Sequence, residues 1–158
     1  MSQSFETEFE IDKDVPLVRI IREFAAEPAR VFAAHADGAL YAKWIGPANS
    51  NVTIDHWDCR TGGSYRWAIT REDFDARFFG SFHDVRPNEL IVQTFTFEGM
   101  RGEVALEKVH FAATGKGHTL LTTTSLVDSF ADRDAFVASG MVSGVTDGYN
   151  ALDGILAS

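Results

Sequence analysis

The middle of the chain alternates between apolar and polar positions in short runs. Between residues 51 and 127 these runs are separated by turn-forming segments such as "TGG", "RPN" and "TGKG". Alternation with a period of two is typical of half-buried strands, because successive side chains of a strand point to opposite faces of the sheet. The pattern predicts an antiparallel meander of six strands, over residues 52–58, 64–71, 76–86, 89–98, 103–112 and 118–127.

The segments before this meander have a different pattern. Residues 17–26, "LVRIIREFAA", are rich in β-branched and aromatic residues and predict one more strand. Pro28 opens "PARVFAAHADGALYAKWI", which predicts two short helices broken near Gly38. Residues 1–16 are polar and are interpreted as a flexible lead-in, so that residues 17–158 form a single domain.

The tail of the chain has helical spacing. An apolar stripe predicts a long C-terminal helix with one buried face, along Phe136, Val137, Met141, Val145, Tyr149, Leu152 and Leu156. Together these elements predict an α+β fold. In this fold a curved antiparallel sheet of six to seven strands wraps around the long helix, and two short helices follow the first strand. Such a fold encloses a hollow, and we expect its mouth where the short helices meet the sheet edge.

Three glycines recur every four residues in this predicted helix, at Gly140, Gly144 and Gly148. Each costs about 0.5–1 kcal/mol of helix stability relative to alanine, so another requirement must favour them. Two explanations are open: the helix approaches the sheet closely there, or the missing side chains leave room for a ligand. Close packing is the favoured explanation, because admitting a neighbouring backbone is the commoner use of glycine.

Composition narrows the possible functions. The 158 residues include 23 acidic and 14 basic side chains, a net charge of −9 that repels a phosphate backbone and argues against nucleic-acid binding. Nowhere do about 18 apolar residues follow one another, so no membrane span is predicted. The acidic N-terminus lacks the apolar run of a secretion signal, and a single cysteine cannot form an intramolecular disulfide. We therefore expect a cytoplasmic protein.

The segment "DCRTGGSYRW", residues 58–67, poses the first chemical question. Cys59 could be a nucleophile, but activation needs a nearby base, and His56 is expected on the opposite face of the strand. A small, buried, apolar role for Cys59 is favoured. Gly62 and Gly63 lack the flanking pattern of a phosphate-binding loop and predict a tight turn between two strands, with positive φ at one or both glycines.

Histidines and carboxylates supply the remaining polar candidates. The five histidines have no metal-ligand spacing and no cysteine pairs accompany them, so neither a metal site nor a cofactor is predicted. His83 lies in a predicted strand rich in phenylalanine. There it could project into the hollow as an acid, a base or a hydrogen-bond donor, although a half-exposed strand histidine is the favoured interpretation.

Glu107 lies in a strand whose register is ambiguous. An inward Val109 would carry Glu107 inward, whereas inward Val104 and Leu106 would turn it outward. A β-bulge near Glu107–Lys108 would reconcile the two registers. A solvated carboxylate is favoured over a buried one, because burying an unpaired charge is costly.

Several segments together resemble a known family. "PARVFAAHADGALYAKWIGP", "DCRTGGSYRW", "QTFTFEGMRGEV" and "DRDAFVASGMVSGVTDGYNALDGIL" are similar to segments of activator of heat-shock-protein-90 ATPase homologue-like proteins, within the START-related helix-grip superfamily. The similarity extends over residues 17–156. It implies a helix-grip fold with a ligand-binding hollow. The family's name comes from eukaryotic co-chaperones in which this domain is joined to another domain, so the name does not by itself imply an activity.

The leading hypothesis is a non-enzymatic protein that binds an apolar or aromatic ligand between the sheet and the long helix. A cyclase-like or hydrolase-like enzyme using the same hollow, with His83 or Glu107 as acid or base, is an alternative. A chaperone-related interaction domain is another, and a homodimer is possible. The residues expected around the ligand are Trp44, Trp67, Phe79, Phe82, His83, Phe95, Phe97, Glu107, Met141 and Tyr149.

Overall fold

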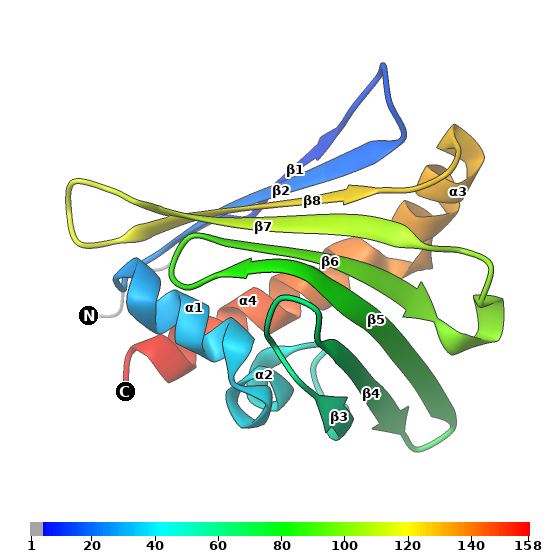
Figure 1. Ribbon diagram of the computed structural model, residues 1–158, viewed down its shortest axis with the longest axis horizontal. Helices are drawn as coiled ribbons and strands as arrows, with labels where there is room; N and C mark the ends of the chain where they lie inside the picture. The colour runs from blue at the N-terminus through cyan, green and yellow to red at the C-terminus, as the bar shows by residue number, and fades with distance from the viewer. Residues whose placement is uncertain (1–4) are drawn as a thin grey trace.

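A computed structural model describes residues 5–158 and shows one large antiparallel sheet (Figure 1). The sheet has eight strands in the order β1-β2-β8-β7-β6-β5-β4-β3, so β1 and β3 are its edges. The strands are β1 (Glu8–Ile11), β2 (Leu17–Phe24), β3 (Asn51–Trp57), β4 (Ser64–Arg71), β5 (Phe74–Arg86), β6 (Leu90–Phe97), β7 (Ala105–Ala113) and β8 (Thr119–Leu126).

The helices lie before and after the meander. The short helices are α1 (Pro28–Ala36) and α2 (Gly38–Trp44), and the C-terminal segment comprises α3 (Phe130–Phe136), a π-helical turn (Val137–Met141) and α4 (Val142–Leu156). Figure 1 shows this C-terminal segment running along the sheet, from α3 at one end to the short helices at the other. Within residues 5–158, no helix combines the length and the apolar character needed to cross a bilayer.

The predicted helix-grip architecture is confirmed. All six meander strands are present, with ends within two residues of the predicted ones, and the two short helices meet at Asp37. The Asp37 side chain accepts hydrogen bonds from the backbone N–H groups of Ala39 and Leu40 and so caps α2. The break near Gly38 is therefore a capped helix start.

The segment before Leu17 differs from the prediction of a loose lead-in. Residues 8–11 form β1, which pairs with β2 and brings the sheet to eight strands. Phe9 lies opposite Ile20 in this pairing and packs against the core, whereas its glutamate neighbours are exposed. This short alternation is the strand signal that the polar composition of residues 1–16 obscures.

The hydrophobic core lies between the sheet and α4. Leu152 is completely buried, and the Tyr149 ring packs edge-on against Phe24 of β2, with their centroids 5.2 Å apart. At the end of the sheet next to α1 and α2, the rings of Phe32 and His35 pack against Phe111 of β7. These side chains fill the end of the hollow where the mouth was expected, so the prediction of a mouth at the short helices is wrong.

The three glycines of the C-terminal segment have three different surroundings. Gly140 has a φ of +92°, a left-handed conformation that interrupts the helix between α3 and α4. A Cβ atom on Gly148 would lie 2.9 Å from the backbone oxygen of Trp44, whereas one on Gly144 would meet nothing within 4 Å. Close packing therefore explains Gly148, but the neighbour is the end of α2 and not the sheet.

Replacing Gly144 and Gly148 by alanine should change stability in opposite directions. Gly144→Ala should raise the free energy of unfolding by about 0.5–1 kcal/mol, because alanine favours the helix and open space is available. Gly148→Ala should lower it by about 1–3 kcal/mol, because α4 must move away from α2. Urea unfolding of both variants measures the difference. Equal stabilisation by the two substitutions would contradict the close approach of α4 to Trp44.

Candidate functional site

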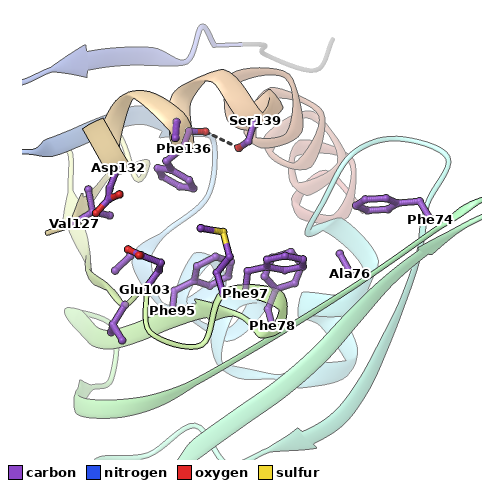
Figure 2. A pocket seen from close by; sticks show the side chains of 14 residues that line it. Phe74, Ala76, Phe78, Phe95, Phe97, Glu103, Val127, Asp132, Phe136 and Ser139 are labelled. Carbon is purple, nitrogen blue, oxygen red and sulfur yellow. Dashed lines mark hydrogen bonds between the residues drawn. The ribbon is translucent and has the colours of Figure 1, made fainter. Parts of the chain in front are cut away.

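A cavity of about 460 Å³ opens at the end of the sheet that carries α3. Figure 2 shows phenylalanine side chains from the sheet on one side of it and the α3 segment on the other. Strands β5, β6 and β7, the loop between β6 and β7, the loop after β8 and the α3 segment all contribute to the wall. The lining residues are Phe74, Ala76, Phe78, Phe95, Phe97, Met100, Glu103, Val104, Ala105, Val127, Asp132, Ala135, Phe136 and Ser139.

Aromatic rings form the sheet side of this cavity. The rings of Phe78 and Phe95 stack with centroids 5.0 Å apart, and Phe97 lies 5.7 Å from Phe78. Trp67 lies against Phe78 at 4.7 Å without lining the cavity itself. Strand register produces this arrangement, because Phe78 is opposite Trp67 on β4 and opposite Phe97 on β6. Side chains opposite each other across an antiparallel pair project to the same face.

The helical side of the cavity depends on where α3 begins and ends. Ser129 caps its start by accepting a hydrogen bond from the Asp132 backbone N–H at 3.1 Å. Phe136 points into the cavity in Figure 2, and the Ser139 hydroxyl donates to its carbonyl oxygen at 2.6 Å. The left-handed Gly140 then separates this segment from α4. The C-terminal helix therefore covers the core with α4 and the cavity with α3.

Three carboxylates gather at the mouth of the cavity. Ligand atoms of Glu103, Asp128 and Asp132 lie within 4.8 Å of one another, close enough to share one cation. The negative charges of Asp132 and Asp128 raise the pKa of the Glu103 carboxyl, with the Asp132 charge as the larger cause. None of the residues lining the cavity is basic. The mouth of the cavity is therefore acidic.

A row of three polar side chains crosses the inner face of the sheet next to the cavity. Glu107 of β7 lies opposite Gln93 of β6 and Ser125 of β8. The Ser125 hydroxyl donates to Glu107 Oε2 at 2.6 Å, and Gln93 Nε2 donates to Oε1 at 3.3 Å. Burial raises the pKa of the Glu107 carboxyl, and these two hydrogen bonds oppose that shift only in part. We call Gln93, Glu107 and Ser125 the polar row.

The register of β7 differs from the predictions for Glu107. The strand pairs regularly with both neighbours, so there is no bulge near Glu107–Lys108. Glu107 points inward with Val109, Leu106 is exposed on the outer face, and Val104, which precedes the strand, is 44% exposed beside the cavity. Glu107 therefore faces the interior with part of its surface accessible, and not the outer face of the sheet. Two neutral hydrogen-bond donors make the burial tolerable.

Three tyrosines approach the polar row from other elements. Tyr65 of β4 donates its hydroxyl to the carbonyl oxygen of Thr94 at 2.6 Å, and the hydroxyls of Tyr149 and Thr123 lie 3.4 Å apart. Tyr41 of α2 packs between aromatic rings. Burial is the main cause that raises the pKa of all three phenols, that of Tyr149 to about 12. All three are neutral at physiological pH.

The expected ligand residues divide into groups in the structure. Phe95 and Phe97 line the cavity. Glu107 does not line it and belongs to the next inward-facing pair of residues after Phe95 and Ala105. Five others are buried core residues that do not line the cavity, namely Trp44, Trp67, Phe82, Met141 and Tyr149. Trp67 Nε1 has no hydrogen-bond partner among the described residues.

Phe79 and His83 lie on the outer face of the sheet and do not line this cavity. Phe79 is opposite Arg66, and the Arg101 guanidinium lies 5.5 Å from the centre of its ring. His83 is exposed at a register shift between Phe82 and Asp84. The exposure of His83 agrees with the favoured interpretation of a strand histidine in contact with solvent.

Cys59 is half-buried against the core, where a buried position was expected, and the double-glycine turn has the positive φ expected of it. Burial raises the pKa of the Cys59 thiol to about 11, which leaves almost no thiolate at neutral pH. Gly62 has a φ of +86°, and a Cβ atom on Gly63 would lie 1.9 Å from the Asp58 carbonyl oxygen. The backbone of both glycines also pairs with Phe82 on β5, which attaches the turn to the sheet.

Most of the cavity wall was not among the expected residues. Phe78 could have been found from period-two alternation, because it lies four residues before Phe82 in the same strand and so faces the same side of the sheet. Phe136 lies on the predicted apolar stripe of the tail. The carboxylates Glu103 and Asp132 come from segments far apart in the chain and have no local sequence signal of proximity.

Comparison with known proteins identifies the chain's relatives. Residues 25–157 match the sequence model of a family described as activator of Hsp90 ATPase homolog 1-like protein. Among curated protein sequences there is no significant match.

Solved bacterial structures share the fold. A protein from Mycobacterium smegmatis superposes with a TM-score of 0.86 at 21% identity, covering 97% of each chain. One from Rhodobacter sphaeroides gives 0.85 at 22% identity, covering 95% of this chain and 97% of that one. A protein from Arthrobacter aurescens gives 0.86 at 21% identity, with 95% and 91% covered. At these identities the likeness shows the fold alone.

Proposed function

Since the chain belongs to the family of activator of Hsp90 ATPase homolog 1-like proteins, we propose that its domain binds one small, predominantly apolar molecule in the cavity between α3 and the sheet. The observation that carries the proposal is the cavity itself. Its volume of about 460 Å³ lies within the roughly 300–1,000 Å³ typical of small-molecule sites. Such sites are lined mainly by apolar side chains with a few polar groups, as this one is.

The cavity walls also favour an aromatic or aliphatic ligand over a polar one. Phe78, Phe95 and Phe136 present ring surface to the cavity, and carboxylates occur only where it opens. Phe97 and Met100 remain 40% and 56% exposed at the mouth. Each 100 Å² of such apolar surface covered by a ligand contributes about 2.5 kcal/mol of favourable transfer free energy. The gain from covering these side chains supports binding of an apolar molecule.

Filling the cavity from its helical side should abolish binding without disturbing the core. Ala135 lines the cavity from an exposed position on α3, so the indole of an Ala135→Trp variant would occupy ligand space. We expect the dissociation constant of the neutral fluorescent probe N-phenyl-1-naphthylamine to rise by about tenfold or more. Fluorescence titration measures this change. Native mass spectrometry of freshly purified protein would show any molecule that co-purifies.

Ala131→Trp is the matched control for this experiment. Ala131 is exposed on the same helix but does not line the cavity, so its replacement should leave probe binding unchanged. Equal binding by the wild-type protein and Ala135→Trp would place the probe elsewhere and count against this cavity. Equal weakening by both variants would indicate a general disturbance of α3.

A further inference from the structure

The polar row adjoins the inner end of the cavity but does not line it. Phe95 and Ala105, which line the cavity, lie opposite each other on β6 and β7. Gln93 and Glu107 form the next inward-facing pair, two residues further along each strand, or about 7 Å deeper. Ser125 extends this row across β8, two residues before the cavity-lining Val127. The Glu107 carboxyl therefore lies next after the apolar rings along the inner face of the sheet.

Accessible surface on the inner face supports this continuity. Gln93 and Glu107 point toward the interior, and each is only partly covered by protein atoms. Their neighbours on the same strands, Ile91 and Val109, are buried. Part of the surface of Gln93 and Glu107 is therefore accessible where the inner face adjoins the cavity.

Among residues 5–158, Glu107 has no positively charged hydrogen-bond or ion-pair partner. Both of its hydrogen bonds come from neutral donors, and the ion pairs among residues 5–158 do not include it. The facing titratable groups are Tyr41 from α2, Tyr65 from β4 and Tyr149 from α4, all neutral phenols. An ionised carboxylate at this depth is costly until a cation pairs with it.

Arg22, a buried cation of the core, is already engaged. Arg22 of β2 binds both carboxylate oxygens of Asp153, at 3.0 and 2.6 Å, and the carbonyl oxygen of Glu23. Its side chain is completely buried in this arrangement and cannot reorient toward Glu107 without breaking the pair. Arg22 therefore does not supply a positive charge to Glu107.

We propose that the site takes a molecule with an apolar or aromatic body and a protonated amine, and that the ammonium group pairs with Glu107. This inference rests on the proposed function and names its ligand class. The aromatic walls accommodate the body and also favour a cation that passes over their faces. Glu103 and Asp132 at the mouth attract a cation and repel carboxylate ligands such as fatty acids.

Two nearly isosteric probes test this assignment. 1-Naphthylmethylamine carries the ammonium group at pH 8, and 1-naphthylmethanol has a neutral hydroxyl in its place. Isothermal titration should show that the wild-type protein binds the amine about tenfold or more tightly than the alcohol. Glu107→Gln, which keeps the shape of the side chain, should remove this preference and retain binding of the alcohol. The double variant Glu103→Gln/Asp132→Asn should retain most of the preference for the amine.

The pH dependence provides a second test that needs no substitution. Burial raises the pKa of Glu107, so protons compete with the ammonium group for this carboxyl. The affinity for the amine should therefore fall as pH is lowered from 8 toward 5, and the affinity for the alcohol should change much less. If the affinity for the amine still falls in Glu107→Gln but no longer falls in the double variant Glu103→Gln/Asp132→Asn, the pH dependence comes from Glu103 and Asp132. That result would overturn the role of Glu107.

The remaining outcomes separate this inference from the proposed function. Binding of the alcohol with equal or higher affinity than the amine would overturn the amine assignment and leave the cavity as an apolar site. An amine preference that survives in Glu107→Gln would also overturn it. If N-phenyl-1-naphthylamine and both naphthyl probes fail to bind, the proposed function itself is contradicted.

Discussion

Asp153→Ala is expected to lower the free energy of unfolding by about 3–5 kcal/mol, because it leaves the buried Arg22 guanidinium without its counterion. The pair joins β2 to α4 through two hydrogen bonds, and Arg22 also packs over the Phe24 ring at 4.8 Å. Urea unfolding followed by circular dichroism measures the loss. The expected loss comes from leaving the buried Arg22 charge without a counterion. It is therefore larger than the stability difference between the ion pair and two apolar residues in the same positions.

Two further variants isolate this cause. The double variant Arg22→Met/Asp153→Ala removes both charges and should be more stable than Asp153→Ala alone, because no charge remains uncompensated. Glu10→Ala breaks the exposed ion pair with Arg19 and should change stability by less than about 1 kcal/mol. If Asp153→Ala costs no more than Glu10→Ala, the buried pair does not fix α4 on the sheet.

The Arg22–Asp153 pair also shows which structural features the sequence contains and which it does not. Arg22 occupies an inward position in the alternation of β2, between the buried Ile20 and Phe24, so its burial could be read from the pattern. Its partner lies 131 residues later in the chain. Only the packing of α4 against β2 brings them together, and no local periodicity specifies that contact.

Strand positions were predictable because alternation and turn residues are local signals. The register of β7 was not, since Val104 and Leu106 are apolar and yet exposed, and the charged Glu107 points inward. Exposed apolar side chains are common on protein surfaces, so they are weak evidence for an inward face. The hydrogen bond from Ser125, on a separate strand, offsets part of the cost of burying Glu107.

The candidate site was only partly predictable for a related reason. Phe79 and Phe82 have opposite parity in one strand and cannot both face the hollow, a constraint that alternation already contains. Alternation does not predict the end of the sheet at which the cavity opens. Phe32 and His35 close one end by packing on Phe111, and the amount of space that helices fill depends on tertiary packing.

Trp44→Ala is expected to lower the free energy of unfolding by about 3–5 kcal/mol, as for other large-to-small core substitutions. Trp44 is 4% exposed, and its Nε1 donates to the Ala34 carbonyl oxygen at 2.9 Å. Its ring packs on His35 and Tyr149, so its removal leaves a void where α1, α2 and α4 meet. Thermal and urea unfolding measure the loss.

Phe97→Ala is the contrasting variant, because Phe97 lines the cavity mouth and is 40% exposed. Its stability cost should be smaller than that of Trp44→Ala, and its effect on N-phenyl-1-naphthylamine binding should be larger. Trp44→Ala should bind the probe with near wild-type affinity under conditions where it is folded, because Trp44 does not line the cavity. The reverse pattern, with Trp44→Ala stable but defective in binding, would show that ligand reaches the α2 end of the core.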